Sequence, residues 1–464
     1  MGPKSFLQSS ESSFKNLVFH FVGVGGIGMC GLAEILLNLG ALVSGSDLQS
    51  NEMTRFLEKR GLRFFGGHAA DHVGSQTQVV VVSTAIPRAN PEIQRALELR
   101  IPVIGRAEAL SEIMRLRRGI AVAGAHGKTT TTSLIASILI DGGAKPSVVV
   151  GGRVPMMNST ACWGEGDWLV AEADESDASF LRLNPEISVV TNIDDDHLDH
   201  YRQSSKIDEA FALFADRIPF YGCLVACGDN DRVYSLFKDF HKRVIFYGFK
   251  QRNELRIFDF EAGVGSAKSR WKLELENGNF LSFESPFPGE HHALNATAAF
   301  QVARLVGLPF FKICNSISSF QGVDRRFHFQ RSFGLADIYD DYAHHPTEIL
   351  ATLKSFKEKF PQQRLLVLFQ PHRYSRTLHS IESFEACFAQ ADELWIAETY
   401  AAGEKPEAGL DSKDLLMRVR HSRSQFLDAS MAQEILSRAA QEKSILLLLG
   451  AGNINHFFDG VSVE

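Results

Sequence analysis

Short apolar runs alternate with amphipathic stretches along the chain from Leu17 onward. A short apolar run bounded by polar residues is typical of a buried strand, and apolar positions that recur every three or four residues are typical of a helix. In the first part of the chain this pattern predicts four strands and, between the first two, one helix: Val18–Val22, the helix Met29–Leu39, Ala41–Ser44, Val79–Ser83 and Pro102–Ile104. Strands that alternate with helices predict a parallel sheet, so we expect an α/β domain.

The same alternation restarts after a basic run at residues 115–118. Four further strands are predicted, at Ile120–Ala123, Ser147–Val150, Trp168–Ala171 and Ile187–Thr191. Polar and apolar residues then alternate from Leu255 to Phe283 around Asn277-Gly278, a dipeptide that favours a hairpin turn. We therefore expect a second α/β domain that carries a β appendage.

A third region follows two predicted helices, Ala293–Leu305 and Phe310–Phe320. Its predicted strands are Leu335–Tyr339, Arg364–Phe369, Glu393–Ile396 and Ser444–Leu449. A single hydrophobic core stops growing near about 250 to 300 residues, and this chain has 464 residues. We predict three α/β domains, over residues 1–117, 118–322 and 323–464.

Composition and charge narrow the possible functions. The chain is 45% hydrophobic and 22% charged, and its longest apolar runs fall short of the ~18 residues that a membrane span needs. The first 15 residues are polar and Ser-rich, without the apolar segment of a secretion signal, so we expect a cytoplasmic protein that does not insert into membranes. A net charge of -7 argues against a general affinity for nucleic acid. The six cysteines include Cys223 and Cys227, which flank an apolar run and are expected to be buried thiols rather than zinc ligands.

A glycine-rich loop, Gly23-Val24-Gly25-Gly26-Ile27-Gly28, lies between the first predicted strand and helix. Asp47 follows the second strand. Glycines in this position let the backbone approach a pyrophosphate at a helix N-terminus, and the later carboxylate can reach a ribose. On its own the loop indicates an NAD-dependent enzyme, although a tight turn without a ligand has the same pattern.

A second loop, Gly124-Ala125-His126-Gly127-Lys128-Thr129-Thr130, also joins a predicted strand to a predicted helix. It differs from the usual phosphate-binding loop because Val122 stands where the first glycine is expected. The remaining parts are present: backbone N–H groups that can cradle phosphates, Lys128 for the β- and γ-phosphates, and the Thr129 hydroxyl for Mg²⁺. A hydride-transfer enzyme has no need of such a loop, so the sequence favours an ATP-dependent reaction.

Acidic side chains follow two strands of the second domain, in the segments Glu172–Asp177 and Asn192–His197. Ligands of open parallel sheets bind at the carboxyl ends of the strands, so both segments are expected near the phosphate-binding loop. Carboxylates beside a triphosphate suit Mg²⁺. His197 is either a ligand of this ion or a hydrogen-bonded structural histidine.

Two polar segments follow strands of the third domain in the same way, Asp340–Pro346 and Gln370–Arg376. Both are expected at strand ends that open into a crevice. The arginines there suit recognition of a carboxylate or a phosphate through paired hydrogen bonds.

Taken in order, these motifs resemble the Mur ligase family, and in particular its alanine-adding branch, from about Val18 to the C-terminus. Further motifs that carry the resemblance are Gly45-Ser46-Asp47, Thr191-Asn192-Ile193, His291-His292-Ala293-Leu294-Asn295, Asp324-Arg325-Arg326 and His372-Arg373-Tyr374-Ser375-Arg376. The resemblance implies an N-terminal Rossmann-like domain for the UDP group, a central P-loop ATPase domain and a C-terminal Rossmann-like domain for the amino acid. It also implies that the first glycine loop binds the UDP diphosphate rather than NAD.

The activity implied is the ATP-dependent joining of L-alanine to the lactyl carboxylate of UDP-N-acetylmuramate through an acyl phosphate, in peptidoglycan synthesis. ATP, Mg²⁺, the sugar nucleotide and alanine would be the ligands of a monomer or weak homodimer. Related branches carry a carbamylated lysine in a stretch that matches Ala210–Ala215, which has no lysine here. An NAD-dependent oxidoreductase and a nucleotide-binding regulator without catalysis are the alternatives.

The resemblance also implies roles for single residues. For ATP these are Gly124, Ala125, His126, Gly127, Lys128, Thr129, Thr130, His291, Asn295 and Arg326. For the sugar nucleotide and alanine they are Gly25, Gly26, Ile27, Gly28, Asp47, Ser83, Tyr342, His344, Arg373 and Arg376. The expected metal ligands are Thr129, Glu172 and His197, and the expected catalytic residues are Lys128, Glu172, His197 and His344.

Overall fold

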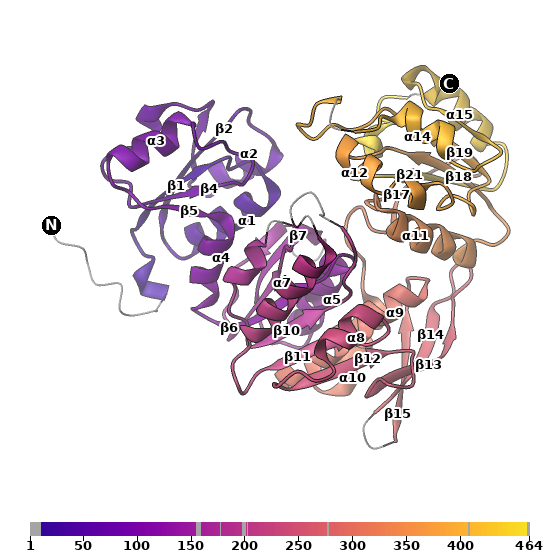
Figure 1. Ribbon diagram of the computed structural model, residues 1–464, viewed down its shortest axis with the longest axis horizontal. Helices are drawn as coiled ribbons and strands as arrows, with labels where there is room; N and C mark the ends of the chain where they lie inside the picture. The colour runs from indigo at the N-terminus through magenta and orange to yellow at the C-terminus, as the bar shows by residue number, and fades with distance from the viewer. Residues whose placement is uncertain are drawn as a thin grey trace. The chain divides into compact units, whose positions relative to one another are not determined.

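The computed structural model describes residues 11–154, 159–176, 178–196, 201, 203–275, 278–406 and 409–461. The chain divides into two compact units. Figure 1 labels their helices and strands. One holds residues 1–256 and 295–316, and the other holds residues 257–294 and 317–464. In the described part of the chain, no helix is both long enough and apolar enough to cross a membrane.

The first sheet of the first unit is parallel, with strand order β3-β2-β1-β4-β5. Its strands are β1 (Val18–Val22), β2 (Leu42–Asp47), β3 (Arg63–Gly66), β4 (Val79–Val82) and β5 (Val103–Gly105). Its helices are α1 (Ile27–Asn38), α2 (Glu52–Glu58), α3 (Pro91–Glu98) and α4 (Arg106–Met114), with a short 3-10 helix η2 (Ala70–His72). The strand order reverses at β1, and a crevice for ligands forms where it reverses, beyond the carboxyl ends of the strands. The first glycine loop lies there.

The second sheet of this unit has the order β12-β11-β10-β6-β9-β7-β8, and the first two residues of β13 pair with β12. Its strands are β6 (Arg118–Ala123), β7 (Ser147–Val154), β8 (Ser159–Cys162), β9 (Trp168–Glu172), β10 (Ile187–Val190), β11 (Cys223–Cys227), β12 (Val244–Gly248) and β13 (Leu255–Glu261). The helices are α5 (Lys128–Asp141), α7 (Ser204–Asp216) and α8 (Asp231–Phe237). Only β8 is antiparallel to its neighbour within this order. All four residues of β10 and the last five of β6 are buried, as expected of a parallel sheet covered on both faces.

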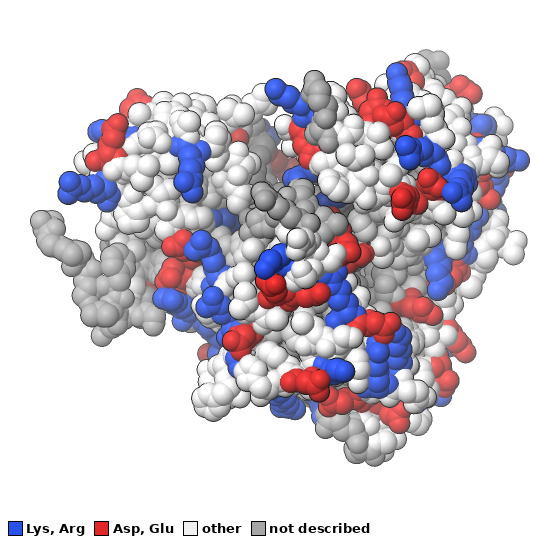
Figure 2. Space-filling model, viewed as in Figure 1, with Lys and Arg blue, Asp and Glu red and all other residues white. Residues whose placement is uncertain are grey.

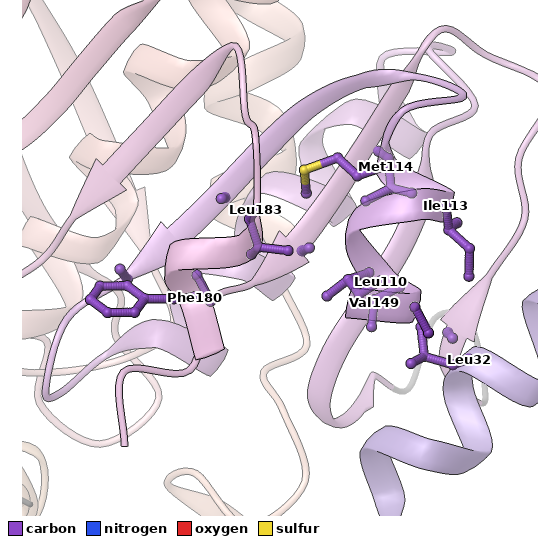
Figure 3. Packing of buried hydrophobic residues seen from close by; sticks show 14 of the residues in the cluster. Leu32, Leu110, Ile113, Met114, Val149, Phe180 and Leu183 are labelled. Atoms are coloured by element: carbon purple, nitrogen blue, oxygen red, sulfur yellow. The ribbon is translucent and has the colours of Figure 1, made fainter. Parts of the chain in front are cut away.

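One hydrophobic core joins the two sheets of the first unit (Figure 3). It contains Leu32 of α1, three residues of α4 (Leu110, Ile113 and Met114), Val149 of β7, Phe180 of the 3-10 helix η3 (Ser179–Arg182), and Leu183, which follows that helix. A Cβ added to Gly31 of α1 would lie 3.0 Å from the Ala161 Cβ of β8, so the helix approaches the second sheet closely. The helix that begins at the first glycine loop is therefore anchored to the sheet that carries the second loop.

The second unit contains the antiparallel pair β14 (Ser269–Glu274) and β15 (Phe280–Ser285) and a six-stranded sheet of order β16-β17-β21-β18-β19-β20. The strands of that sheet are β16 (His328–Phe333), β17 (Ala336–Asp341), β18 (Arg364–Phe369), β19 (Glu393–Ile396), β20 (Ser424–Phe426) and β21 (Ser444–Leu449). The helices are α11 (Pro346–Lys359), α12 (Tyr374–His379), α13 (Ile381–Phe384), α14 (Ser412–Arg418) and α15 (Ala432–Ala439). Helices α9 (Glu290–Val306) and α10 (Phe310–Ser319) connect segments of the two units.

Alternate residues of β18 belong to different cores, which explains its unbroken apolar sequence. Leu365, Val367 and Phe369 pack in one core, whereas Leu366 and Leu368 pack in the other. Side chains of a strand alternate between the faces of its sheet, so both faces of β18 are covered.

The charged surface is mixed. On the face shown in Figure 2, basic and acidic side chains are interspersed. Several form local ion pairs, such as Arg118 with Glu186 and Arg232 with Asp208. The first of these pairs is bonded twice, with Arg118 Nε 2.8 Å from a Glu186 oxygen.

The predicted fold class is confirmed, since the chain has three α/β regions built on parallel or mixed sheets. The expected elements are present, with small shifts at their ends: β2 continues to Asp47 instead of ending at Ser44, and α1 begins at Ile27. The strands β3, β8, β11, β12, β16 and β20 were not predicted. Of these, β3, β16 and β20 are half-exposed and lack a clear apolar pattern, whereas β11 and β12 are buried apolar runs. Cys223 and Cys227 are buried free thiols, as expected. The domain boundaries stay a prediction.

Replacement of Phe180 by alanine is expected to destabilise the first unit. Its ring is buried and packs on Phe211 and Phe214, with centroid distances of 5.3 and 4.9 Å. A buried Phe→Ala change costs about 3 to 5 kcal/mol through lost burial and the remaining cavity. Thermal unfolding measures the effect, and Phe220→Ala is the control because Phe220 is 90% exposed. Equal melting temperatures for the two variants would contradict the described packing.

Candidate active site

The second glycine loop connects β6 to α5 and depends on two glycines. Gly124 and Gly127 have φ angles of 136° and 80°, which side chains with a Cβ rarely adopt. A Cβ on Gly124 would lie 2.0 Å from the Thr191 hydroxyl, and one on Gly127 would lie 2.8 Å from Asn295 Oδ1. The backbone therefore packs closely against side chains from the end of β10 and from α9.

Side chains at the end of β10 hold this loop in shape. The His126 N–H donates to Asn192 Oδ1 (2.8 Å), and the His126 carbonyl accepts from Asn192 Nδ2 (2.9 Å) and the Thr191 hydroxyl (2.6 Å). Helix α5 starts directly after the loop, and its N-cap residue Gly127 offers no capping side chain. The first N–H groups of a helix bind anions readily, so the loop is built to receive a phosphate.

Lys128 is the first residue of α5 and lies over the loop. Its Nζ donates to the Gly124 carbonyl (2.6 Å), the Ala125 carbonyl (3.2 Å) and Glu175 Oε1 (2.7 Å). Burial alone would lower the pKa of Lys128, but the carboxylates of Glu175, Asp174 and Glu172 outweigh it and raise that pKa. The lysine therefore carries a positive charge at the phosphate-binding loop.

Thr129 and Glu172 bring a hydroxyl and a carboxylate together beside the loop. The Thr129 hydroxyl donates to both oxygens of Glu172, at 3.1 and 3.0 Å. The Gly151 N–H also donates to Glu172 Oε2 (2.8 Å), which fixes the carboxylate. Oxygen donors at this spacing suit a hard divalent cation. His197, the third expected metal ligand, lies outside the described residues.

Three other residues expected to bind ATP, Thr130, Asn295 and His126, lie in or beside the loop. Thr130 is buried in the first turn of α5. Asn295 lies against Gly127, as described above. His126 points to Asp194, with its Nε2 3.0 Å from Asp194 Oδ2. Motifs at the ends of β6, β9 and β10, together with Asn295 of α9, thus converge on one loop.

The first glycine loop is bound by residues of β2 and α2. The Gly23 and Val24 N–H groups donate to the Ser46 carbonyl (2.9 and 3.0 Å). Asp47 Oδ2 accepts from the Gly25 N–H (2.8 Å), while Asn51 Nδ2 donates to the Gly25 carbonyl (2.9 Å). A Cβ on Gly25 would lie 2.8 Å from Asp47 Oδ2, so a side chain there would displace the Asp47 carboxylate.

The other residues predicted for this loop are its neighbours. Gly26 is the N-cap of α1, and Ile27, the first helical residue, is 52% exposed. Ser83 directly follows β4, and a Cβ on Gly23 would lie 3.3 Å from its Cβ. The structure therefore brings the predicted residues of the first domain together around one helix N-terminus.

Arg106 joins the two loops and was missed by the sequence analysis. It is the first residue of α4, and a Cβ on Gly28 would lie 3.0 Å from Arg106 Cδ. Its Nη2 lies 3.4 Å from Asp174 Oδ2, in the acidic segment that faces Lys128. Arg106 belongs to no motif that the sequence analysis used, and its position depends on tertiary structure.

The second unit gathers the polar segments that follow β17 and β18. The ring centroids of Tyr342 and His344 are 5.4 Å apart, and those of His344 and His372 are 5.7 Å apart. Arg376 Nη1 lies 3.2 Å from His372 Nδ1, and the Arg326 guanidinium lies over the Tyr342 ring at 5.1 Å. Two predicted clusters therefore form one cationic and aromatic group.

Backbone constraints fix the arginine segment. Arg373 has a φ of 68°, and its N–H donates to the Tyr400 carbonyl (2.9 Å). The His344 N–H donates to Glu348 Oε2 (3.1 Å), and Arg326 Nη1 lies 3.8 Å from Glu348 Oε1. The strained turn at Arg373 and the two contacts with Glu348 hold these segments in place at the strand ends.

His291 lies at the start of α9 in the second unit. Burial lowers the pKa of His291 to about 4, and the nearby cations Lys354 and Arg326 act in the same direction. The imidazole is therefore neutral near pH 7, and its ring lies 4.3 Å from that of His292.

Family comparisons match nearly the whole chain. Residues 18–118 match the Mur ligase family catalytic domain, residues 122–303 the Mur ligase middle domain, and residues 325–452 the Mur ligase glutamate ligase domain. The chain is a Mur ligase.

Curated relatives of this Mur ligase are similar over their full length. A UDP-N-acetylmuramate–L-alanine ligase of Bdellovibrio bacteriovorus is 47% identical over 94% of this chain and 96% of its own. A protein of the same name from Desulfotalea psychrophila is 45% identical over 95% of this chain and 96% of its own.

Solved structures agree in fold. The Thermotoga maritima UDP-N-acetylmuramate-alanine ligase matches with a TM-score of 0.80 and 27% identity, over 96% of this Mur ligase and 97% of that chain. A murein peptide ligase of Psychrobacter arcticus has a TM-score of 0.73 at 22% identity, over 97% of this chain and 100% of its own, which indicates the shared fold.

Replacement of Gly124 by alanine is expected to disrupt the phosphate-binding loop of this Mur ligase. The variant adds a clash with Thr191 to the cost of a positive φ. Gly143→Ala is the matched control, because Gly143 has a φ of 86° but no atom within 4 Å of an added Cβ. The control should lose only about 1 to 2 kcal/mol from its backbone conformation. Urea unfolding and binding of a fluorescent ATP analogue compare the two, and equal losses would refute the described packing of the loop.

His291 predicts a pH dependence of stability. Its folded pKa of about 4 lies below the ordinary value of 6.5, so the unfolded chain takes up the proton first as pH falls. The contribution of His291 is present above pH 6.5 and is lost as pH falls toward 4. In thermal unfolding between pH 7.5 and 4.5, His291→Gln should lose less stability than the unmodified protein. The control is His241→Gln, whose side chain is 67% exposed and which should lose as much stability as the unmodified protein. If His291→Gln loses as much stability as this control, His291 does not cause the pH dependence.

Proposed function

We infer that this Mur ligase joins L-alanine to UDP-N-acetylmuramate with the energy of ATP, in peptidoglycan synthesis. The observation that carries the inference is the full-length similarity to L-alanine ligases, combined with a charged lysine and a carboxylate–hydroxyl pair at one phosphate-binding loop. A cytoplasmic location and a monomeric or weakly dimeric state remain predictions.

The reaction requires activation of a carboxylate, because a carboxylate is too poor an electrophile for an amine. We propose that an oxygen of the lactyl carboxylate attacks the γ-phosphorus of ATP, forming an acyl phosphate and releasing ADP. The neutral amine of alanine then attacks the acyl carbon. The tetrahedral adduct expels phosphate, and the amide remains.

Lys128 stabilises the transferring phosphoryl group. Its Nζ is held by two loop carbonyls and Glu175, so the charge is positioned before the phosphates arrive. Phosphoryl transfer is accelerated mainly by positioning and by fixed charges of this kind. The loop N–H groups from Gly124 to Thr130 and the side chain of Asn295 would surround the same phosphates. His291 and Arg326 are also proposed to bind ATP.

Thr129 and Glu172 are proposed to hold Mg²⁺, together with His197. The fit rests on the donor set, a hydroxyl and a fixed carboxylate within 3.1 Å of each other at the start of α5. When bound, the ion would supply positive charge to offset the developing negative charge on the phosphate oxygens.

The remaining predicted residues are proposed to bind the other substrates. Gly25, Gly26, Ile27 and Gly28 would approach the UDP diphosphate, with Asp47 and Ser83 beside it. Tyr342, His344, Arg373 and Arg376 would receive the carboxylates of the sugar nucleotide and alanine, which guanidinium groups recognise through paired hydrogen bonds. His344 is also expected to act in catalysis.

Phosphate release tests the proposed function. The protein is supplied with ATP, Mg²⁺ and UDP-N-acetylmuramate, each component is omitted in turn, and L-alanine is compared with glycine, L-serine and a recycled tripeptide. We expect release that depends on alanine, with a matching mass gain on the sugar nucleotide. Dependence on the tripeptide would reassign the substrate, and no release with any acceptor would refute ligase activity.

Lys128→Ala is expected to lower turnover by about a hundredfold or more, as loss of one fixed charge stabiliser does. The phosphate-release assay at saturating substrates measures the effect. Lys206→Ala is the control, because that side chain is 55% exposed and pairs only with a neighbouring surface glutamate among the described contacts. Near-normal turnover of Lys128→Ala would rule out the proposed role of the lysine.

A further inference from the structure

Three histidines and a serine surround one buried carboxylate in the first domain. Glu92 lies in the first turn of α3 and has no exposed surface. Its oxygens accept from the Ser46 hydroxyl (2.6 Å) and lie 2.6 Å from His72 Nδ1 and 3.1 Å from His68 Nδ1. His20 Nε2 lies 3.6 Å away. We call these five residues the Glu92 cluster.

Each neighbour of Glu92 comes from a different element. His20 lies on β1, Ser46 on β2, His68 after β3 and His72 in η2. Both His20 and Ser46 are buried, and His68 and His72 side chains are each 15% exposed. A single carboxylate on α3 is therefore in contact with several segments of the first domain.

The cluster holds Glu92 ionised. Burial opposes ionisation, but the nearby His20 imidazole and hydrogen bonds with Ser46 and His72 outweigh it and lower the pKa of Glu92 to about 2. Burying a charge in a protein is costly unless it is hydrogen-bonded, and an apolar side chain would fill the same space without that cost. The arrangement suggests a role beyond packing.

The cluster is connected to the first glycine loop through Ser46. The Ser46 hydroxyl donates to Glu92, and the Ser46 carbonyl accepts from the Gly23 and Val24 N–H groups. The next residue, Asp47, binds the Gly25 N–H through its carboxylate, and its carbonyl accepts from the Gly67 N–H (2.7 Å). His68 of the Glu92 cluster directly follows Gly67.

We propose that Glu92 is a positioning residue for the sugar nucleotide, one that fixes Ser46 and His68 and through them the glycine loop and Asp47. The proposal rests on the proposed function, in which this loop binds the UDP diphosphate. Glu92 itself touches no substrate. It acts by fixing the position of Ser46 and Asp47 at the C-terminal end of β2. Its loss should therefore weaken binding of the sugar nucleotide and leave the rate of the chemical step unchanged.

The test is a comparison of steady-state constants for Glu92→Gln, which keeps the shape of the side chain and removes its charge. We expect the KM for UDP-N-acetylmuramate to rise about tenfold, the change that follows when a charge-assisted hydrogen bond supporting a site is lost. The kcat and the KM values for ATP and alanine should stay within about twofold. Glu98→Gln on the same helix is the control, since Glu98 is 64% exposed and should change none of these constants.

Ser46→Ala provides a second variant that leaves Glu92 with its histidines. It should raise the KM for UDP-N-acetylmuramate. The double variant should raise this KM by less than the product of the two single effects, because both changes affect the same hydrogen bond between Ser46 and Glu92. Titration calorimetry with UDP extends the test to binding without turnover.

The outcomes separate the two proposals. Absence of alanine-dependent phosphate release in the unmodified protein would refute the proposed function itself. A normal ligase whose Glu92→Gln variant keeps its KM for the sugar nucleotide, or shifts all three KM values together while melting at a lower temperature, would instead overturn the positioning role and leave Glu92 as a structural residue.

Discussion

The structure depends on a backbone constraint at the carboxyl ends of two parallel strands. After β1 and again after β6, the chain turns directly into a helix, and the turn packs so tightly that a Cβ would overlap a neighbour at Gly25 or Gly124. Glycine permits the close approach at both positions and the positive φ at Gly124. Each turn then presents the N–H groups of a helix N-terminus, where negative charge is favoured. The same structural device is therefore used twice, and each turn is proposed to bind an anion.

The two sites belong to one unit and share its core. Helix α1 starts at the first loop and packs against β7 and β8 of the second sheet, while α4 and η3 fill the space between (Figure 3). Arg106 adds a polar connection, because it lies over the first loop and faces Asp174 beside Lys128. Charge balance completes the second site: the carboxylates of Glu172, Asp174 and Glu175 keep Lys128 protonated. A ligase must bring a sugar nucleotide to the γ-phosphate of ATP, and this coupling of loops suits that task.

Much of this arrangement was predictable from sequence, for physical reasons. Strands β1, β6 and β18 are buried on both faces, so their apolar runs are unambiguous. Both glycine loops carry their geometry in local residue types, and the rule that ligands bind at strand ends predicted that Glu172 and Asn192 lie near Lys128.

The rest depended on tertiary contacts that leave no local signal. Edge strands such as β3 and β16 are half-exposed, so their sequences resemble loops. The Lys128–Glu175 ion pair joins residues 47 positions apart, and Arg106 and Glu92 acquire their partners only when the sheets assemble. Neither belongs to a recognisable motif. The residue roles stay predictions, and His197 lies outside the described residues.

The central claim is that the second loop activates a carboxylate by phosphorylation, and oxygen transfer tests it most directly. UDP-N-acetylmuramate labelled with ¹⁸O in its lactyl carboxylate is turned over with ATP and alanine, and the released phosphate is analysed by mass spectrometry. The account predicts one ¹⁸O atom in each phosphate, because the carboxylate oxygen that attacks phosphorus leaves with it. Amide formation with unlabelled phosphate would contradict the acyl-phosphate route.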